Sequence, residues 1–115
     1  MAINPGSFLP LPAPAFHILV ALSDHDRHGY AIMQDVAART SGEVKLNAGT
    51  LYTTIKRLLE QDLIVEVRAP RGTDSSDERR RYYRLTPLGR AVAQAELARL
   101  KAMVRRAASA LLPNS

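Results

Sequence analysis

The stretch that most constrains the fold is residues 46–63, LNAGTLYTTIKRLLEQDL, which predicts one amphipathic helix with its own start signal. Asn47 is a favourable N-cap, whose side chain accepts a hydrogen bond from the amide of Gly49 or Thr50. An apolar stripe follows at the helical period: Leu51, Ile55, Leu58 and Leu59. The opposite face carries small, hydroxyl-bearing and cationic residues: Gly49, Thr50, Thr53, Lys56 and Arg57. Such a face suits an approach to phosphates and base edges, and the alternative is an ordinary surface helix.

The length of 115 residues predicts one domain with a small core, and 46% of the residues are apolar. The absence of cysteine excludes disulfides, a thiolate nucleophile and a cysteine-based zinc site. No apolar run approaches about 18 residues, so we expect no membrane span. No basic segment precedes an apolar one, so we expect no signal peptide and a cytoplasmic location. Nucleophile-elbow and phosphate-loop motifs are also absent, so we expect neither enzymatic activity nor a cofactor.

Positive charge is concentrated in the second half of the chain. Residues 1–66 carry five Lys and Arg against seven Asp and Glu, a net charge of −2. Residues 67–115 carry eleven against four, a net charge of +7. A basic region of this kind indicates a polyanionic partner, and the alternative is a solvated surface that happens to be basic.

The first forty residues predict an irregular arm followed by two short helices. Prolines 5, 10 and 12 exclude a helix over residues 1–13, so we expect the arm's apolar residues to pack on the body or on a second subunit: Phe8, Leu9 and Leu11. A buried helix over residues 14–23 and a polar turn over 23–29 come next. The turn contains Asp24, His25, Asp26 and His28, which we interpret as capping residues rather than metal ligands because their spacing fits no common site.

The helix after this turn is predicted over residues 29–40, with an apolar stripe of Tyr30, Met33, Val36 and Ala37 and with Ile32 beside it. Gly42 is a suitable left-handed stop. Two helices joined by a short connection that contains glycine, the second with a polar face, form a helix-turn-helix pattern.

Beyond residue 62 the periodicity changes to that of a β-hairpin. Residues 63–68 and 79–85 predict two strands around the polar loop 69–78, and a hairpin in this position is a wing. In the second strand, Tyr83 and Leu85 are expected to face the core, opposite Arg80, Tyr82 and Arg84. Arginine binds phosphate bidentately, so Arg71, Arg80 and Arg84 are the predicted phosphate contacts of the wing.

A last helix is predicted over residues 86–111, capped by Thr86 with Pro87 in its first turn. Apolar residues spaced four and three apart form a seam: Ala93, Leu97, Leu100, Val104, Ala107 and Leu111. We expect this seam to pack against a second copy of the chain. The alternative is that the helix folds back onto its own core.

Four motifs together resemble the PadR family of bacterial transcriptional regulators. They are HGYAI at residues 28–32, LNAGTLYTTIKRL at 46–58, LI at 63–64 and RRRYYRLTPLGR at 79–90. The resemblance covers about residues 14–92, and Ala48 stands where the family often has proline. It implies a winged helix-turn-helix repressor that binds operator DNA as a homodimer, in a compact subfamily whose single C-terminal helix forms the dimer interface. Some compact members bind flat hydrophobic drugs between subunits through a tryptophan, which this chain lacks.

We therefore predict a mainly α fold with a β-hairpin (α+β): an arm at 1–13, a winged helix-turn-helix at 14–85 and a dimerisation helix at 86–112. The predicted partners are double-stranded DNA and a second copy of the chain. The predicted DNA-binding residues are Asn47, Thr50, Tyr52, Thr53, Lys56, Arg57, Arg71, Arg80 and Arg84. Tyr52 lies at the boundary of its helix faces, where packing and a phosphate contact are both open. The alternative function is a ligand-sensing dimeric module with a small hydrophobic effector between its subunits.

Overall fold

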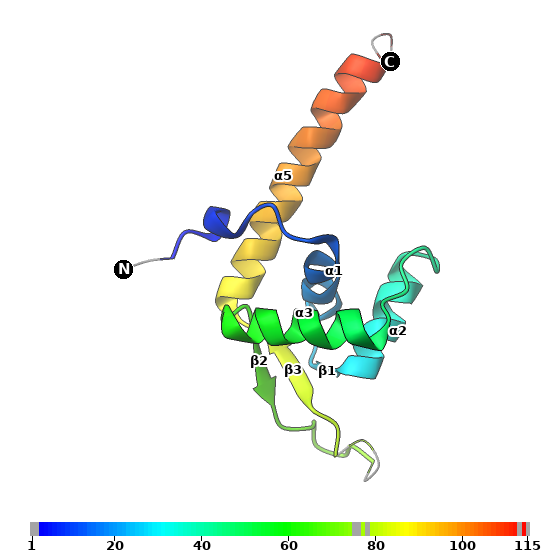
Figure 1. The fold of residues 1–115 in the computed structure, drawn as a ribbon, viewed down its shortest axis with the longest axis vertical. Helices are drawn as coiled ribbons and strands as arrows, with labels where there is room; N and C mark the ends of the chain where they lie inside the picture. Colours follow the sequence, from blue (N-terminus) through cyan, green and yellow to red (C-terminus); the bar gives the residue numbers. More distant parts are fainter. Residues whose placement is uncertain (1–2, 75–76, 78, 113, 115) are drawn as a thin grey trace.

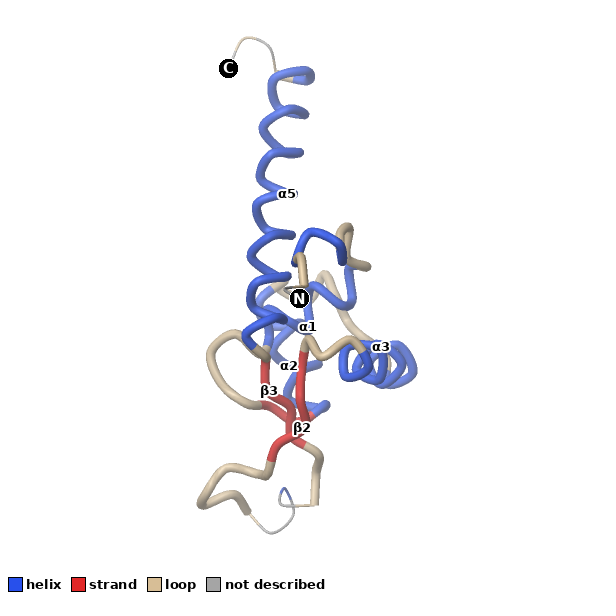
Figure 2. Tube along the Cα trace, turned by 90° about the vertical axis from the view of Figure 1, so that its left-hand side faces the viewer, coloured by secondary structure: helices blue, strands red, loops and turns tan. Residues whose placement is uncertain are grey.

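The computed structural model describes residues 3–74, 77, 79–112 and 114, and it has the predicted α+β architecture (Figure 1). The shorter helices pack together into a core, a small antiparallel sheet extends into a hairpin, and a long helix projects from the opposite side (Figures 1 and 2). In chain order the elements are η1 Pro5–Phe8, α1 Ala13–Ala21, β1 Arg27–His28, α2 Gly29–Arg39, α3 Ala48–Glu60, β2 Ile64–Val67, β3 Tyr82–Leu85 and α5 Pro87–Leu111.

Helix α1 lies at the centre of the core, as its nearly uniform apolar sequence predicts. Ile18 and Leu19 are fully buried, and α1 packs against α2, α3 and the start of α5. The stripe predicted for α3 also faces this core, with Leu51, Ile55 and Leu58 buried. Burying each large aliphatic side chain stabilises the fold by about 1.5–3 kcal/mol. This contact is therefore the main attachment of α3.

The stripe predicted for α2 is wrong by one position at its start. Gly29, Ile32 and Val36 are the buried residues, whereas Tyr30 is 51% exposed. Gly29 takes the inward position of the first turn because it faces Tyr52 of α3. Tyr30 consequently points toward the hairpin, where the guanidinium carbon of Arg80 lies 5.5 Å from its ring centroid.

The sheet has a third strand that the sequence did not predict. β1, within the expected turn, pairs with β3, and the strand order is β1-β3-β2 with all pairs antiparallel. β3 is therefore the central strand, and both Tyr82 and Tyr83 are buried. The prediction that Tyr82 faces outward is wrong because β1 covers it, with the His28 ring edge-on at 5.2 Å.

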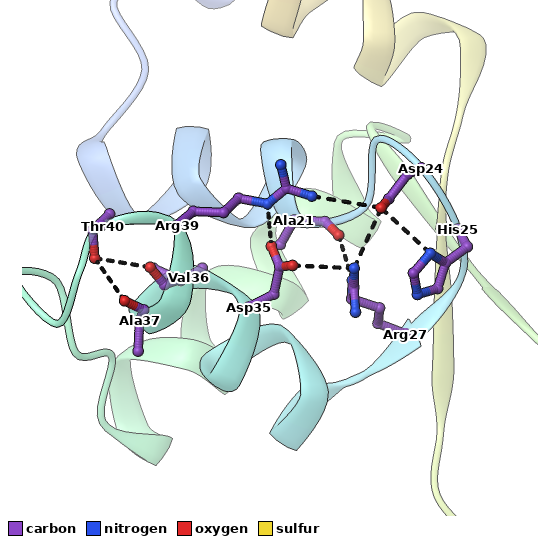
Figure 3. A network of polar contacts seen from close by, with 9 residues as sticks. All are labelled: Ala21, Asp24, His25, Arg27, Asp35, Val36, Ala37, Arg39 and Thr40. Atoms are coloured by element: carbon purple, nitrogen blue, oxygen red, sulfur yellow. Dashed lines mark hydrogen bonds and ion pairs between the residues drawn. The ribbon is translucent and has the colours of Figure 1, made fainter.

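A polar network joins the β1 turn to α2 (Figure 3). The Arg27 guanidinium donates to the carbonyl oxygen of Ala21 at 2.8 Å and lies 3.1 Å from Asp35 Oδ1. The other oxygen of Asp35 accepts from Arg39 Nε at 2.6 Å, and Arg39 also lies 3.6 Å from Asp24. The acidic residues of this corner thus pair with arginines. Among the described residues, no three metal-ligating side chains form a cluster that could hold an ion.

The N-terminal arm packs on the core and on α5. Its apolar residues are partly buried against the core, as predicted: Phe8, Leu9 and Leu11. The prediction of an entirely irregular arm is wrong, because Pro5–Phe8 form one 3-10 turn capped by the Asn4 side chain. Leu11 N–H donates to Oε2 of Glu96 at 2.9 Å, which ties the arm to α5.

Helix α5 packs on the domain only along its first turns. Thr86 caps it as predicted, and Gly89, Val92 and Glu96 are buried. The C-terminal part of the helix extends away from the other elements (Figures 1 and 2). It does not fold back onto the core, which was the alternative to packing of the seam against a second copy. No helix among the described residues is both long enough and apolar enough to cross a membrane.

Candidate nucleic-acid interface

Helix α3 presents an uncovered polar face beside the hairpin. Asn47 caps it, with Oδ1 accepting from Thr50 N–H at 2.8 Å, so Asn47 positions the first turn. Thr53, Lys56 and Arg57 are exposed, and Thr50 is half-buried. Within the described part of the chain, neither Lys56 nor Arg57 has a carboxylate partner. Their charges are therefore available to a polyanion.

Arg57 lies on the side of this face that borders the N-terminal arm. With Thr53 it helps line a hollow of about 180 Å³, whose other wall includes Phe8 and Leu11. Lys56 is not among the residues that line this hollow. The arm consequently limits the space around one end of the polar face of α3.

Tyr52 is half-exposed yet held in place by close approach to α2. A Cβ atom at Gly29 would stand 2.7 Å from the Tyr52 hydroxyl, so the ring lies directly against the glycine. Packing therefore explains part of the role of Tyr52. Its hydroxyl also opens on a cavity of about 350 Å³ between α2, α3 and the hairpin, here named the α2–wing cavity; its lining residues are His28, Gly29, Tyr30, Tyr52, Arg80, Arg81 and Tyr83.

Arg80 is fixed at the base of the wing. Its Nε lies 3.3 Å from Asp77 Oδ1, and its Nη1 lies 3.3 Å from the His28 ring nitrogens. His28 Nδ1 accepts from Ala31 N–H at 3.0 Å and so caps α2 in its unprotonated form. Burial lowers the pKa of His28, and the Arg80 guanidinium lowers it further. The wing thus rests against the start of α2 through a cation and a neutral imidazole.

Arg84, another predicted phosphate contact, is held in a bidentate ion pair at the surface. Its Nε and Nη2 donate to the two carboxylate oxygens of Asp26 at 3.0 and 2.9 Å, and these bonds raise the pKa of Arg84. Arg71, by contrast, is exposed in the loop between β2 and β3. The Asp26 carboxylate occupies one edge of the Arg84 guanidinium, so Arg84 is less available to DNA than Arg71.

Arg81 is a candidate contact that the strand pattern missed. Alternation placed it with Tyr83, on the side expected to face the core. β3 begins only at Tyr82, so Arg81 precedes the pleat, and its side chain is 77% exposed. Its Nη1 lies 4.0 Å from Glu66 Oε1. The run of three arginines before two tyrosines could have indicated that Arg81 is exposed, because a run of charges fits a strand end better than a face that packs on the core.

The predicted seam of α5 lies largely uncovered. Leu97, Val104 and Leu111 are 52%, 63% and 78% exposed. Ala107 is also exposed, while Ala93 and Leu100 are partly buried. At the base of the seam is an apolar groove of about 400 Å³; its lining includes Phe16, Leu19, Val20, Leu85, Ala93 and Leu97. Seam and groove together form a continuous apolar surface.

Comparisons with known proteins agree with this architecture. The model of the family described as "Transcriptional regulator PadR-like family" matches residues 18–95. A segment of 74 residues is 36% identical to a Lysinibacillus sphaericus protein called Uncharacterized protein X and covers 64% of this chain. The match spans 65% of the length of that relative.

Two solved structures show the same fold. A PadR family transcription regulator from Clostridium difficile is 25% identical, with a TM-score of 0.70, over 88% of this chain and 99% of that one. PadR from Bacillus subtilis, solved in complex with operator DNA, is 20% identical, with a TM-score of 0.63. That match covers 76% of this chain and 48% of the Bacillus chain.

Proposed function

This chain belongs to the PadR-like family of transcriptional regulators, and from that membership we propose that it is a sequence-specific DNA-binding repressor. It acts as a homodimer on a pseudo-palindromic operator. The polar face of α3 carries this function, because Thr53, Lys56 and Arg57 are exposed beside an arginine-rich wing. The Bacillus subtilis relative was solved with operator DNA, which supports the same class of partner.

In this arrangement α3 enters the major groove and the wing holds the backbone. Thr50, Thr53, Lys56 and Arg57 face the base edges, and Arg71 and Arg80 lie on the phosphate side. Two subunits then read half-sites about one helical turn, or a multiple of it, apart. Repression follows where such a site overlaps a promoter, and deletion of the gene should then raise expression from that promoter.

Replacement of Lys56 tests whether α3 contacts base edges. Lys56→Ala should weaken operator binding by roughly 1–3 kcal/mol if the ammonium touches bases. The operator is first selected from random and genomic DNA, and affinity is then measured by fluorescence anisotropy. Lys101→Ala removes the same charge from an exposed position on α5 and should leave affinity nearly unchanged. Equal losses in both variants would show a non-specific charge effect and contradict base reading by α3.

The uncovered seam supports the homodimer. A contiguous apolar surface on a small domain marks an interaction site, and a seam spaced four and three residues apart fits a copy of itself. Val104→Asp should give monomers in light scattering. Ser109→Asp places the same charge on an exposed position of α5 that is off the seam and should remain dimeric. A dimeric Val104→Asp protein would exclude the seam as the interface.

A small hydrophobic effector is a second candidate, favoured by the apolar groove between α1 and α5. The groove lies at the base of the seam, so a second subunit would help to close it around a ligand. An apolar fluorescent dye should bind the dimer saturably and change operator affinity. Enlarging Ala93 to Leu should fill the groove and remove dye binding, whereas Ala98→Leu, outside the groove, should not.

A further inference from the structure

We propose that the α2–wing cavity is a seat for one phosphate group, supplied by the backbone of the bound DNA strand. This seat deepens the proposed function and rests on it. It differs from base reading by α3, because it lies beside the helix and is built jointly by α2, α3 and the wing.

The cavity has the chemistry of an anion site. Two guanidinium groups and three phenols line it, and among the described residues no carboxylate belongs to its wall, although Asp77 and Glu66 lie beside the two arginines. Guanidinium and hydroxyl groups are the donors that proteins use most on phosphate oxygens. The first turn of α2, an 11-residue helix, also lines the cavity, and its dipole adds positive potential there.

Two of these donors are suited to different tasks. The Tyr52 ring lies against Gly29, which places its hydroxyl at the start of α2 in the unliganded chain. Arg81 is 77% exposed, and its contact with Glu66 at 4.0 Å is too long for a hydrogen bond. Arg81 is therefore free to turn toward a phosphate, while the tyrosine supplies a fixed donor. Such preorganisation reduces the entropy lost on binding.

Arg80 has a supporting role in the same cavity. Contacts with Asp77, His28 and the Tyr30 ring hold it in one position. The charge of Asp77 offsets part of its own, so Arg81 is the better partner for the phosphate. A phosphate in this seat would fix the wing relative to α3, since the two elements would share one ligand.

The test uses the full chain and its selected operator, with affinity measured over a range of salt concentrations. Tyr52→Phe keeps the ring and removes only the hydroxyl, so affinity should fall roughly tenfold with an unchanged salt slope. Arg81→Ala should lower affinity and reduce the slope of log K against log salt by about one. Arg79→Ala removes an exposed arginine outside the cavity and serves as the matched control.

Operators with a single neutral methylphosphonate then locate the contact. Neutralising one particular phosphate should lower the affinity of the wild type and should not lower the affinity of Arg81→Ala any further. The same operator should lower the affinity of Arg79→Ala as much as that of the wild type. If the effect of every methylphosphonate adds to the effects of Arg81→Ala and Tyr52→Phe, while the wild type binds the operator normally, the phosphate seat is overturned. The proposed function is then unaffected.

Titration with inorganic phosphate, followed by NMR at the Gly29 and Tyr52 amides, separates the two sources of phosphate. Saturable shifts that Arg81→Ala abolishes support the seat. If the wild type shows these shifts but binds no duplex at any salt concentration, the donor is free phosphate and the proposed DNA reading fails. If it shows neither shifts nor duplex binding, both fail.

Discussion

Helices α3 and α5 have similar N-terminal caps but differ in how their apolar stripes are covered. Each starts with a polar side chain that caps its first turn, and each carries an apolar stripe. The chain's own core covers the stripe of α3 and leaves a polar face outside. On α5 the last buried residue is Glu96, and the seam beyond it is exposed except at Leu100, which is partly buried.

This difference indicates which partner each helix lacks. A helix whose apolar side is already buried gains little from another protein, and its free cations favour a polyanion. A helix that exposes leucine and valine at coiled-coil spacing gains from burying them, at about 25 cal/mol for each Å² removed from water. Substitutions matched between the two helices test this reading, from the largest expected effect to the smallest.

The largest effect is expected from alanine at the glycine of α5, compared with alanine at the glycine of α3. At Gly89 a Cβ would stand 1.9 Å from the carbonyl oxygen of Leu63, so α5 could not dock without moving backbone. Gly89→Ala should therefore lower the free energy of unfolding by more than about 4 kcal/mol, measured by urea denaturation at fixed protein concentration. Gly49→Ala in α3 meets only Asn47 Oδ1 at 3.4 Å and should be neutral, or stabilising by up to about 1 kcal/mol. Similar losses in both variants would contradict tight docking at Gly89.

Leucine-to-alanine replacement compares the apolar faces directly. Leu51→Ala empties a fully buried site and should cost about 2–5 kcal/mol at any protein concentration. Leu111 is 78% exposed, so Leu111→Ala should change the stability of dilute monomer by no more than about 0.5 kcal/mol. At high concentration Leu111→Ala should melt below the wild type, because only dimerisation uses that side chain. A concentration-independent loss would show that Leu111 packs within its own subunit.

Glu96 marks the boundary between the two halves of α5 and should make stability depend on acid. A hydrogen bond from Arg99 holds the pKa of Glu96 below its ordinary value of 4.5, and the Leu11 N–H adds to this. A lowered folded-state pKa stabilises the fold above the unfolded value, and this stability is lost as pH falls through the folded value.

Glu96→Gln should therefore be less stable than the wild type at neutral pH, and the difference should shrink as pH falls below 4.5. Denaturant midpoints across this range measure it. In an Arg99→Met background, Glu96→Gln should produce a smaller pH-dependent difference in stability, because the main cause of the lowered Glu96 pKa is gone. A difference that stays constant with pH would mean that Glu96 acts by packing alone.

The sequence predicted those features that depend on neighbours along the chain. The caps at Asn47 and Thr86, the stripe of α3 and the exposed seam of α5 all follow from local spacing. The exposed cations Lys56 and Arg57 follow from the same periodicity. These account for the fold class and for the polar face of α3.

The missed features depend on residues far apart in sequence. β1 is two residues long and exists as a strand because β3 pairs with it, and that pairing also buries Tyr82. Arg84 pairs with Asp26, which lies 58 residues earlier in the sequence, and no local pattern predicts that ion pair. The α2–wing cavity depends on the approach of Tyr52 to Gly29, which only the folded chain brings about.

A smaller effect than at Gly89 or Leu51 is expected from the two caps. Thr86 Oγ1 accepts from Gly89 N–H at 2.9 Å and also donates to the Asp62 carbonyl at 2.7 Å, whereas Asn47 only caps. Asn47→Ala should cost about 1 kcal/mol, and Thr86→Ala somewhat more, within the range of about 0.5–2 kcal/mol. Asn47→Gly should cost only a few tenths of a kcal/mol, because glycine is tolerated at this position. Asn47→Gly thus separates the two predicted roles of Asn47: if its side chain contacts DNA, operator affinity falls while the unfolding midpoint stays near that of the wild type. If affinity is unchanged, Asn47 serves the helix alone.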